Sequence, residues 1–147
     1  MPPLSQPVIT VLMVIATAMV QLGMQLVLDL LTPPRSWTHV APSIQRVAVT
    51  ITAIVVLMAG HLVQVAVWAL RYWTWGEVGD FAGSFYFSLA SFTTVGANEL
   101  ELSRTHRMVG SIESALGMLM FGWSTALLVA LIQRVEQLCR QEARLSK

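Results

Sequence analysis

Three long apolar runs limit what this chain can fold into. They cover residues 8–31, 47–70 and 108–132, and each is long enough to cross a bilayer as a helix, because a spanning helix needs roughly 20 residues. The composition agrees, since 55% of the 147 residues are hydrophobic and only 12% are charged, against roughly 25% charged in typical soluble domains. The sequence therefore predicts an all-α membrane protein with three transmembrane helices.

A fourth apolar segment, residues 81–95, is too short to span a bilayer. It begins just after Asp80, a good helix N-cap, and it ends in the turn-forming run Gly96-Ala97-Asn98-Glu99. An apolar helix of this length is typical of a re-entrant segment. Non-helical backbone at membrane depth is tolerated only inside protein or beside a water-filled cavity. We therefore expect a re-entrant helix over 81–93 and a loop at 94–99 that turns back within the membrane.

The sequence Thr93-Thr94-Val95-Gly96 stands where this re-entrant helix ends. Consecutive backbone carbonyls and a threonine hydroxyl can replace the hydration shell of a cation. The string occurs by chance in many proteins, but its place between two spans makes it specific. Thr94, Val95 and Gly96 are the expected ligands of a permeant monovalent cation.

The sequence from Phe85 to Gly96, followed by Phe121-Gly122-Trp123-Ser124-Thr125-Ala126, resembles the pore module of the tetrameric potassium-channel superfamily. By this resemblance residues 44–135 form a pore domain with outer helix 47–70, pore helix 81–93, filter 94–99 and inner helix 108–132. Residues 1–43 add an N-terminal transmembrane helix and a cytoplasmic loop, and 136–147 form a short cytoplasmic tail. Tyr86 and Phe87 take the aromatic positions that support the filter. One subunit cannot enclose a pore, so we expect a homotetramer in the lipid bilayer.

The filter departs from the family's pattern after Gly96. The family continues Gly-Tyr-Gly-Asp, whereas this chain continues Gly96-Ala97-Asn98-Glu99. Ala97 lacks the aromatic ring that anchors the filter, and Asn98 replaces a left-handed glycine, a conformation that asparagine tolerates. Four copies of Glu99 would form a carboxylate ring that attracts cations and could bind Ca²⁺. We expect a cation channel that conducts K⁺, and Na⁺ as well, with relaxed selectivity.

Three further residues of the expected inner helix are candidates for a role in the channel. Gly117 and Gly122 would permit a gate hinge or a close helix approach. Glu113 is expected to brace the filter from behind, with Arg107 or the pore loop as its partner.

Two other functions are alternatives to a cation channel. A non-conducting or regulatory potassium-channel-like subunit would keep the bundle but not the pore. A proton-coupled carrier would use Gln25, Asp29 and His61, but the chain lacks the internal repeat of many carriers. Gln21, Gln25 and Asp29 recur every four residues and form a polar stripe, which we expect to face another helix. No arrangement of residues indicates an enzyme or a resident cofactor, and a net charge of +1 leaves no basic face for nucleic acid.

The distribution of charge predicts the topology. Basic residues concentrate in the C-terminal tail and around the first loop, at Arg134, Arg140, Arg144, Lys147, Arg35 and Arg46, which favours the cytoplasm for both. The N-terminus and the filter loop then lie outside, and a compact chain of this kind is typical of a bacterial inner membrane. Residues 71–76 are expected to form an interfacial belt, with amphipathic rings at headgroup level.

Overall fold

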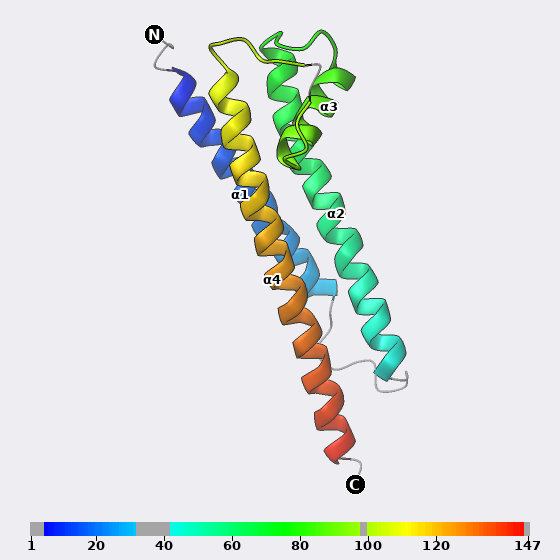
Figure 1. The fold of residues 1–147 in the computed structure, drawn as a ribbon. Coiled ribbons are helices and arrows are strands. Elements are labelled where there is room, and N and C mark those ends of the chain that lie inside the picture. The colour runs from blue at the N-terminus through cyan, green and yellow to red at the C-terminus, as the bar shows by residue number, and fades with distance from the viewer. Residues whose placement is uncertain (1–4, 32–41, 98–99, 146–147) are drawn as a thin grey trace.

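The computed structural model describes residues 5–31, 42–97 and 100–145, and within these ranges all regular structure is helical. The helices are α1 (Ser5–Leu31), α2 (Pro42–Thr74), α3 (Phe81–Phe92) and α4 (Arg107–Leu145) (Figure 1). Three stretches, Gln6–Leu31, Arg46–Thr74 and Arg107–Gln137, are long and apolar enough to cross a membrane. The prediction of an all-α membrane protein with three spans is confirmed.

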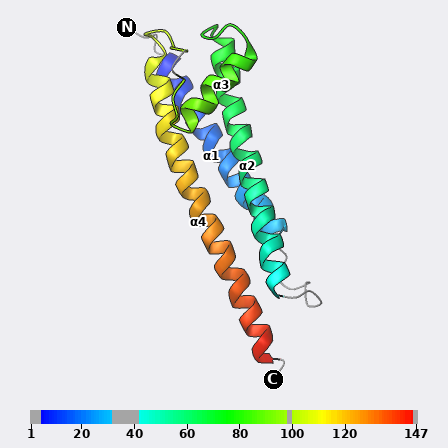
Figure 2. The same ribbon diagram turned by 45° about the vertical axis from the view of Figure 1, so that its right-hand side comes forward.

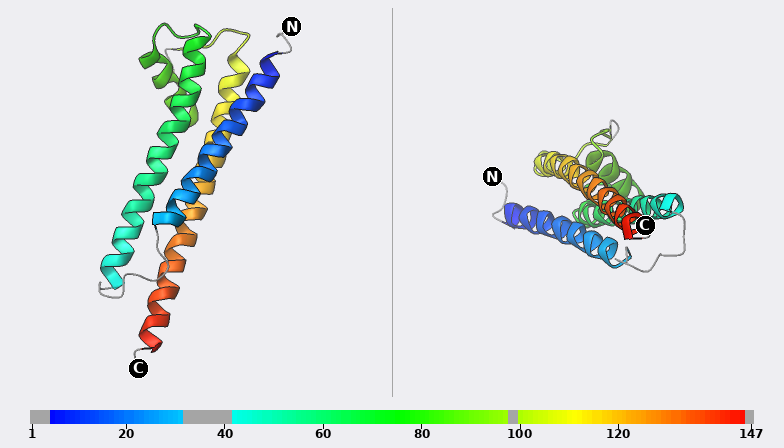
Figure 3. Two further views of the ribbon diagram at one scale, coloured as in Figure 1. Left: turned by 180° about the vertical axis from the view of Figure 1, so that it is seen from behind. Right: turned by 90° about the horizontal axis from the view of Figure 1, so that it is seen from below.

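The three long helices run antiparallel to their sequence neighbours. α1 and α4 both begin at one end of the bundle, here called the filter end, and α2 runs from the opposite tail end back to it (Figures 1 and 2). Seen along the bundle, α1 and α3 lie on opposite sides of α4 (Figure 3). The helix α4 reaches beyond the other helices at the tail end.

The short helix α3 is re-entrant. It starts at the filter end, descends beside α2, and the chain after it climbs back to the filter end before α4 begins (Figure 1). The carboxylate of Asp80 starts the helix, because its Oδ1 accepts a hydrogen bond from the backbone N–H of Gly83 at 2.8 Å. The half-length apolar segment therefore folds as its length and cap predict.

The long helices extend past the apolar runs that predicted them. The helix α2 continues to Thr74, and α4 runs to Leu145, so residues 136–145 of the expected separate tail continue the inner helix. An i, i+4 ion pair of 2.7 Å between Glu136 and Arg140 supports this extension. The end of an apolar run marks the end of burial in lipid, whereas helix formers continue the helix into water. The loop at 32–41 lies outside the described residues.

Two apolar clusters hold the bundle together. The first lies toward the filter end, joins α2, α3 and α4, and contains the fully buried rings of Trp68, Tyr72 and Phe92. The second lies toward the tail end and packs Met24 and Leu28 of α1 against α2 and Leu131 of α4. The re-entrant helix is thus fixed by the first cluster, and α1 by the second.

Candidate ion pathway

The end of α3 is fastened by its own backbone. Thr93 is the C-cap residue, and both its N–H (3.0 Å) and its hydroxyl (2.7 Å) donate to the carbonyl of Leu89. The N–H of Thr94 donates to Ser91 at 3.0 Å, and that of Gly96 donates to Ala90 at 3.0 Å. The hydroxyl of Thr93 therefore serves the helix, while the chain from Thr94 onward is held close to the helix end.

The backbone at the predicted cation ligands adopts an unusual conformation. Thr94 has φ 61° and Gly96 has φ 82°, whereas Val95 between them is not in the positive region. A β-branched residue at positive φ is an outlier, and such a conformation costs about 1–3 kcal/mol, which surrounding structure must offset. Residues held in this way cluster at functional sites. Glycine adopts the same region without penalty.

This strained stretch is uncovered within one chain. The side chain of Val95 is 78% exposed, Thr94 and Gly96 are also exposed, and Ala97 is half-buried. A cavity of about 360 Å³ lies beside Thr94 and Gly96, between α3 and the first turns of α4. Asn98 and Glu99, the outer part of the predicted filter, lie outside the described residues. In the described part of the chain no group of three or more His, Cys, Asp or Glu side chains could hold a metal ion.

Behind this stretch, three buried polar side chains join three helices. Glu113 of α4 is fully buried. One of its carboxylate oxygens accepts a hydrogen bond from the Tyr72 hydroxyl of α2 at 2.6 Å, and the other lies 2.5 Å from the Ser88 hydroxyl of α3. Ser88 also donates to the carbonyl of Val65 at 2.9 Å. This triad of Tyr72, Ser88 and Glu113 fixes the pore helix between the outer and inner helices.

The partners of Glu113 agree only in part with those that the sequence offered. The sequence predicts Arg107 or the pore loop as its partner. The re-entrant segment supplies Ser88, and Tyr72 of α2 takes the place of Arg107. The sequence places Tyr72 in an interfacial belt, but its side chain is fully buried, so its ring does not face the headgroups. The helical spacing of Val65, Trp68 and Tyr72, which share one buried face, was the signal that could have placed it.

The other predicted support residues fall in different surroundings. Phe87 is buried and packs edge-on against Tyr72, with ring centroids 5.1 Å apart. Tyr86 is 57% exposed and points away from its own chain's core. A Cβ added to Gly117 would overlap the backbone carbonyl of Phe92, whereas one added to Gly122 would meet nothing within 4 Å. Gly117 therefore allows α4 to approach the end of α3, and Gly122 is the more open hinge candidate.

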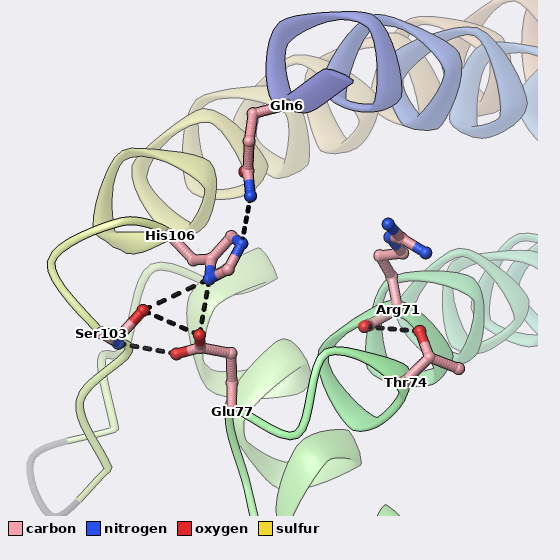
Figure 4. Close-up of polar contacts among 6 residues, drawn as sticks. All are labelled: Gln6, Arg71, Thr74, Glu77, Ser103 and His106. Atoms are coloured by element: carbon pink, nitrogen blue, oxygen red, sulfur yellow. Dashed lines mark hydrogen bonds and ion pairs between the residues drawn. The ribbon is translucent and has the colours of Figure 1, made fainter. Parts of the chain in front are cut away.

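A second polar cluster joins the loops at the filter end (Figure 4). Glu77, in the turn before α3, accepts hydrogen bonds from the backbone N–H of Ser103 at 2.6 Å and from its hydroxyl at 2.7 Å. His106 lies 2.5 Å from Glu77 and also contacts Gln6 of α1. The ring of Trp75 stacks on His106 with centroids 4.2 Å apart, and Arg71 lies over the same indole at 4.4 Å. The cluster ties the loop after the filter to the turn before α3.

Glu77 should make the folded state sensitive to acid. Burial alone raises the pKa of Glu77, but the hydrogen bonds from Ser103 and the contact with His106 outweigh it and hold the pKa below its ordinary value of 4.5. A carboxylate with a lowered folded-state pKa stabilises fully above its ordinary pKa and loses that contribution as the pH falls through the lowered value. We expect Glu77→Gln to flatten the loss of thermal stability below pH 4.5.

The matched control is Glu101→Gln, since Glu101 is an exposed carboxylate in the loop after the filter. Melting temperatures of the two variants and the parent across the acid range provide the comparison. Equal acid sensitivity of the parent and Glu77→Gln would contradict the assignment.

Comparison with known protein families agrees with this geometry. A family model described as "Ion channel" matches residues 51–134, which include α3, the strained stretch and most of α2 and α4. The chain belongs to this ion channel family. This match confirms the resemblance to a two-helix pore module. The helix α1 lies outside the matched residues. No curated protein and no solved structure matches the chain. The protein is thus a multi-pass membrane protein of the ion channel family. Its positive-φ residues Thr94 and Gly96 lie between the two long helices of the matched domain.

Proposed function

We propose that this protein is a cation channel in which four copies surround a pathway lined by residues 94–96. The observation that carries the proposal is the left-handed Thr94, with φ 61°, in an exposed stretch at the end of a re-entrant helix. Strain of this kind persists only where the surrounding structure enforces it, and the hydrogen bonds to the end of α3 and the Glu113 triad supply that support. Backbone carbonyls and the Thr94 hydroxyl would then replace the water shell of a cation.

The proposed channel conducts K⁺ and discriminates weakly against Na⁺. Selectivity depends on the number and stiffness of the coordinating dipoles. Ala97 offers no ring to anchor the loop, and a cavity of about 360 Å³ lies beside Thr94 and Gly96. We further propose that the four Glu99 carboxylates gather cations at the mouth, where Ca²⁺ would compete with the permeant ion.

We also propose an orientation in a bacterial cell membrane, with the filter end and the N-terminus outside. The helix α1 begins at the filter end (Figure 1), so both lie on one side. The basic residues after the last span favour the cytoplasm for the tail end.

Flux from liposomes tests the proposal. Purified protein is reconstituted, and efflux is compared for K⁺, Na⁺ and a large organic cation, with and without external Ca²⁺. We expect K⁺ and Na⁺ to pass within about tenfold of each other and the large cation to be retained. The double variant Ala97→Tyr, Asn98→Gly restores the family's pattern and should raise the K⁺ to Na⁺ ratio. Thr94→Ala, which removes the filter hydroxyl, should lower K⁺ flux.

One other outcome would favour a different function. If neither the parent nor the double variant conducts, while cross-linking still shows tetramers, the protein is better described as a non-conducting member of the family. The exposed Val95 and Tyr86 would then serve subunit contact rather than a pathway. Conduction by the parent excludes this alternative.

A further inference from the structure

The helix α1 lies outside the matched channel domain, yet it contacts α4 at two levels and the turn just before α4 at a third. Near the filter end Gln6 contacts His106, just before α4. In the middle of the bundle Gln21 donates to the hydroxyl of Ser124 at 3.1 Å. Near the tail end Asp29 lies 3.5 Å from Arg134. The first helix therefore follows α4 along much of its length.

The middle contact belongs to a closed ring of four buried side chains, here called the polar ring: Gln21, Ser124, His61 and Gln64. Gln21 donates to Ser124, whose hydroxyl lies 3.0 Å from Nε2 of His61. Nδ1 of His61 lies 3.1 Å from the amide oxygen of Gln64, and the amide nitrogen of Gln64 donates to Gln21 at 3.1 Å.

Within the polar ring, each side chain can donate one hydrogen bond to one neighbour and accept one from the other. A neutral His61 with its proton on Nδ1 completes the circuit, because the Ser124 hydroxyl then donates to Nε2. All four side chains are at most 6% exposed, and Gln64 also donates to the backbone carbonyl of Thr17 in α1 at 3.3 Å. Inside a membrane, groups that lost such partners would find no water to replace them.

The polar ring holds only one part of α4. The half nearer the filter end is fixed by Glu113 to Tyr72 and Ser88, and by the close approach of Gly117 to Phe92. Ser124 and Arg134 both come after Gly122, where an added Cβ would meet nothing within 4 Å. In this structure α4 is one unbroken helix from Arg107 to Leu145. Its two halves are thus attached to different parts of the chain, with a glycine between the attachments.

We propose that α1 is a built-in brace for the inner helix. Through the polar ring, and through Asp29 and Arg134, it holds the half of α4 beyond Gly122 against α1 and α2. Any movement of that half relative to the filter must break the ring. The effect of such a movement on ion flux rests on the proposed channel function. The brace itself does not, because it concerns only the positions of α1 and α4.

Distances between spin labels test the brace without relying on conduction. Labels are placed on cysteines at Leu30 of α1 and Gln133 of α4, both exposed, in a background with Cys139→Ser. Labelled chains are assembled with an excess of unlabelled chains, so that only distances within one chain are recorded. The variants are Ser124→Ala and Gln21→Leu, which remove the ring from opposite helices.

The control is Ser114→Ala, the same substitution on the same helix, because the Ser114 hydroxyl donates only to Gly110 of its own helix at 3.1 Å. We expect both ring variants to raise the ratio of long to short label distances by about 5- to 30-fold, which corresponds to about 1–2 kcal/mol, and the control to match the parent. Ser124→Thr keeps the hydroxyl and should restore the short distance. Unchanged distances in both ring variants, or an equal shift in the control, would overturn the brace.

Flux recorded on the same samples separates this inference from the proposed function. Altered distances with no flux in any variant would sustain the brace and reject the channel. Normal flux in the parent with unchanged distances in the ring variants would reject the brace and sustain the channel.

Discussion

Gly117→Ala is expected to destabilise the folded protein strongly, and Gly122→Ala is expected to leave it unchanged or slightly more stable. The added methyl at position 117 would overlap the backbone carbonyl of Phe92, which cannot rotate away as a side chain could. Either α3 or α4 must shift, and overpacking of this kind costs about 1–3 kcal/mol. At position 122 nothing lies within 4 Å, so the better helix propensity of alanine, worth roughly 0.5–1 kcal/mol, acts alone.

The two glycines make a matched pair, since the substitution and the helix are the same. Thermal unfolding of both variants in one detergent gives the comparison, and flux shows whether the shift of α3 reaches the filter. A melting temperature for Gly117→Ala equal to that of the parent would show that α3 and α4 do not meet as closely as described. A large loss at Gly122 would place that residue in a contact between subunits.

Glu113→Ala is expected to be the most damaging of the polar substitutions. It removes the partner of the Tyr72 hydroxyl, which is fully buried and lies 2.6 Å from the carboxylate, and an orphaned buried group costs about 1–3 kcal/mol. It also leaves a void behind the pore helix. Glu113→Gln keeps an acceptor and a donor of nearly the same shape, so it should retain most of the stability.

A double-mutant cycle isolates the interaction. Tyr72→Phe should cost less in the Glu113→Ala background than in the parent, with a coupling of about 0.5–3 kcal/mol. Tyr86→Phe is the control, because the Tyr86 side chain is 57% exposed. Removing its hydroxyl should change the free energy of unfolding by no more than about 0.5 kcal/mol. Additive costs at Tyr72 and Glu113 would mean that the hydrogen bond contributes nothing net to stability.

The effect of these variants on the filter follows from the same contacts. Ser88 and Phe87 belong to α3, and the strained Thr94 follows the C-cap residue of that helix. If the triad loosens, α3 no longer enforces the left-handed backbone, and Thr94 is expected to relax toward negative φ. In the proposed channel, the loss of stability in Glu113→Ala should therefore be accompanied by a lower ratio of K⁺ to Na⁺ flux.

Local sequence patterns were enough for the framework of the fold. Three runs of apolar residues and one half-length run specify three spans and a re-entrant helix, because lipid thickness fixes the length that each must have. Asp80 marks the start of α3 and the loss of apolar character after Val95 marks its end region, and the structure begins and ends the helix at Phe81 and Phe92. The sequence Thr93-Thr94-Val95-Gly96 pointed to the backbone that the structure shows to be strained at Thr94.

The partners of the buried polar groups came only from the tertiary structure. The sequence indicated that Gln21 and Glu113 needed partners. It did not show that Gln21 would form a ring with His61, Gln64 and Ser124, or that Glu113 would meet Tyr72. A hydrogen bond depends on the rotation of each helix about its own axis and on its depth against its neighbour. Those are set by side-chain packing between residues 41 to 103 positions apart. Hydrophobic length is a property of each segment alone, whereas pairing across helices is a property of the assembled bundle.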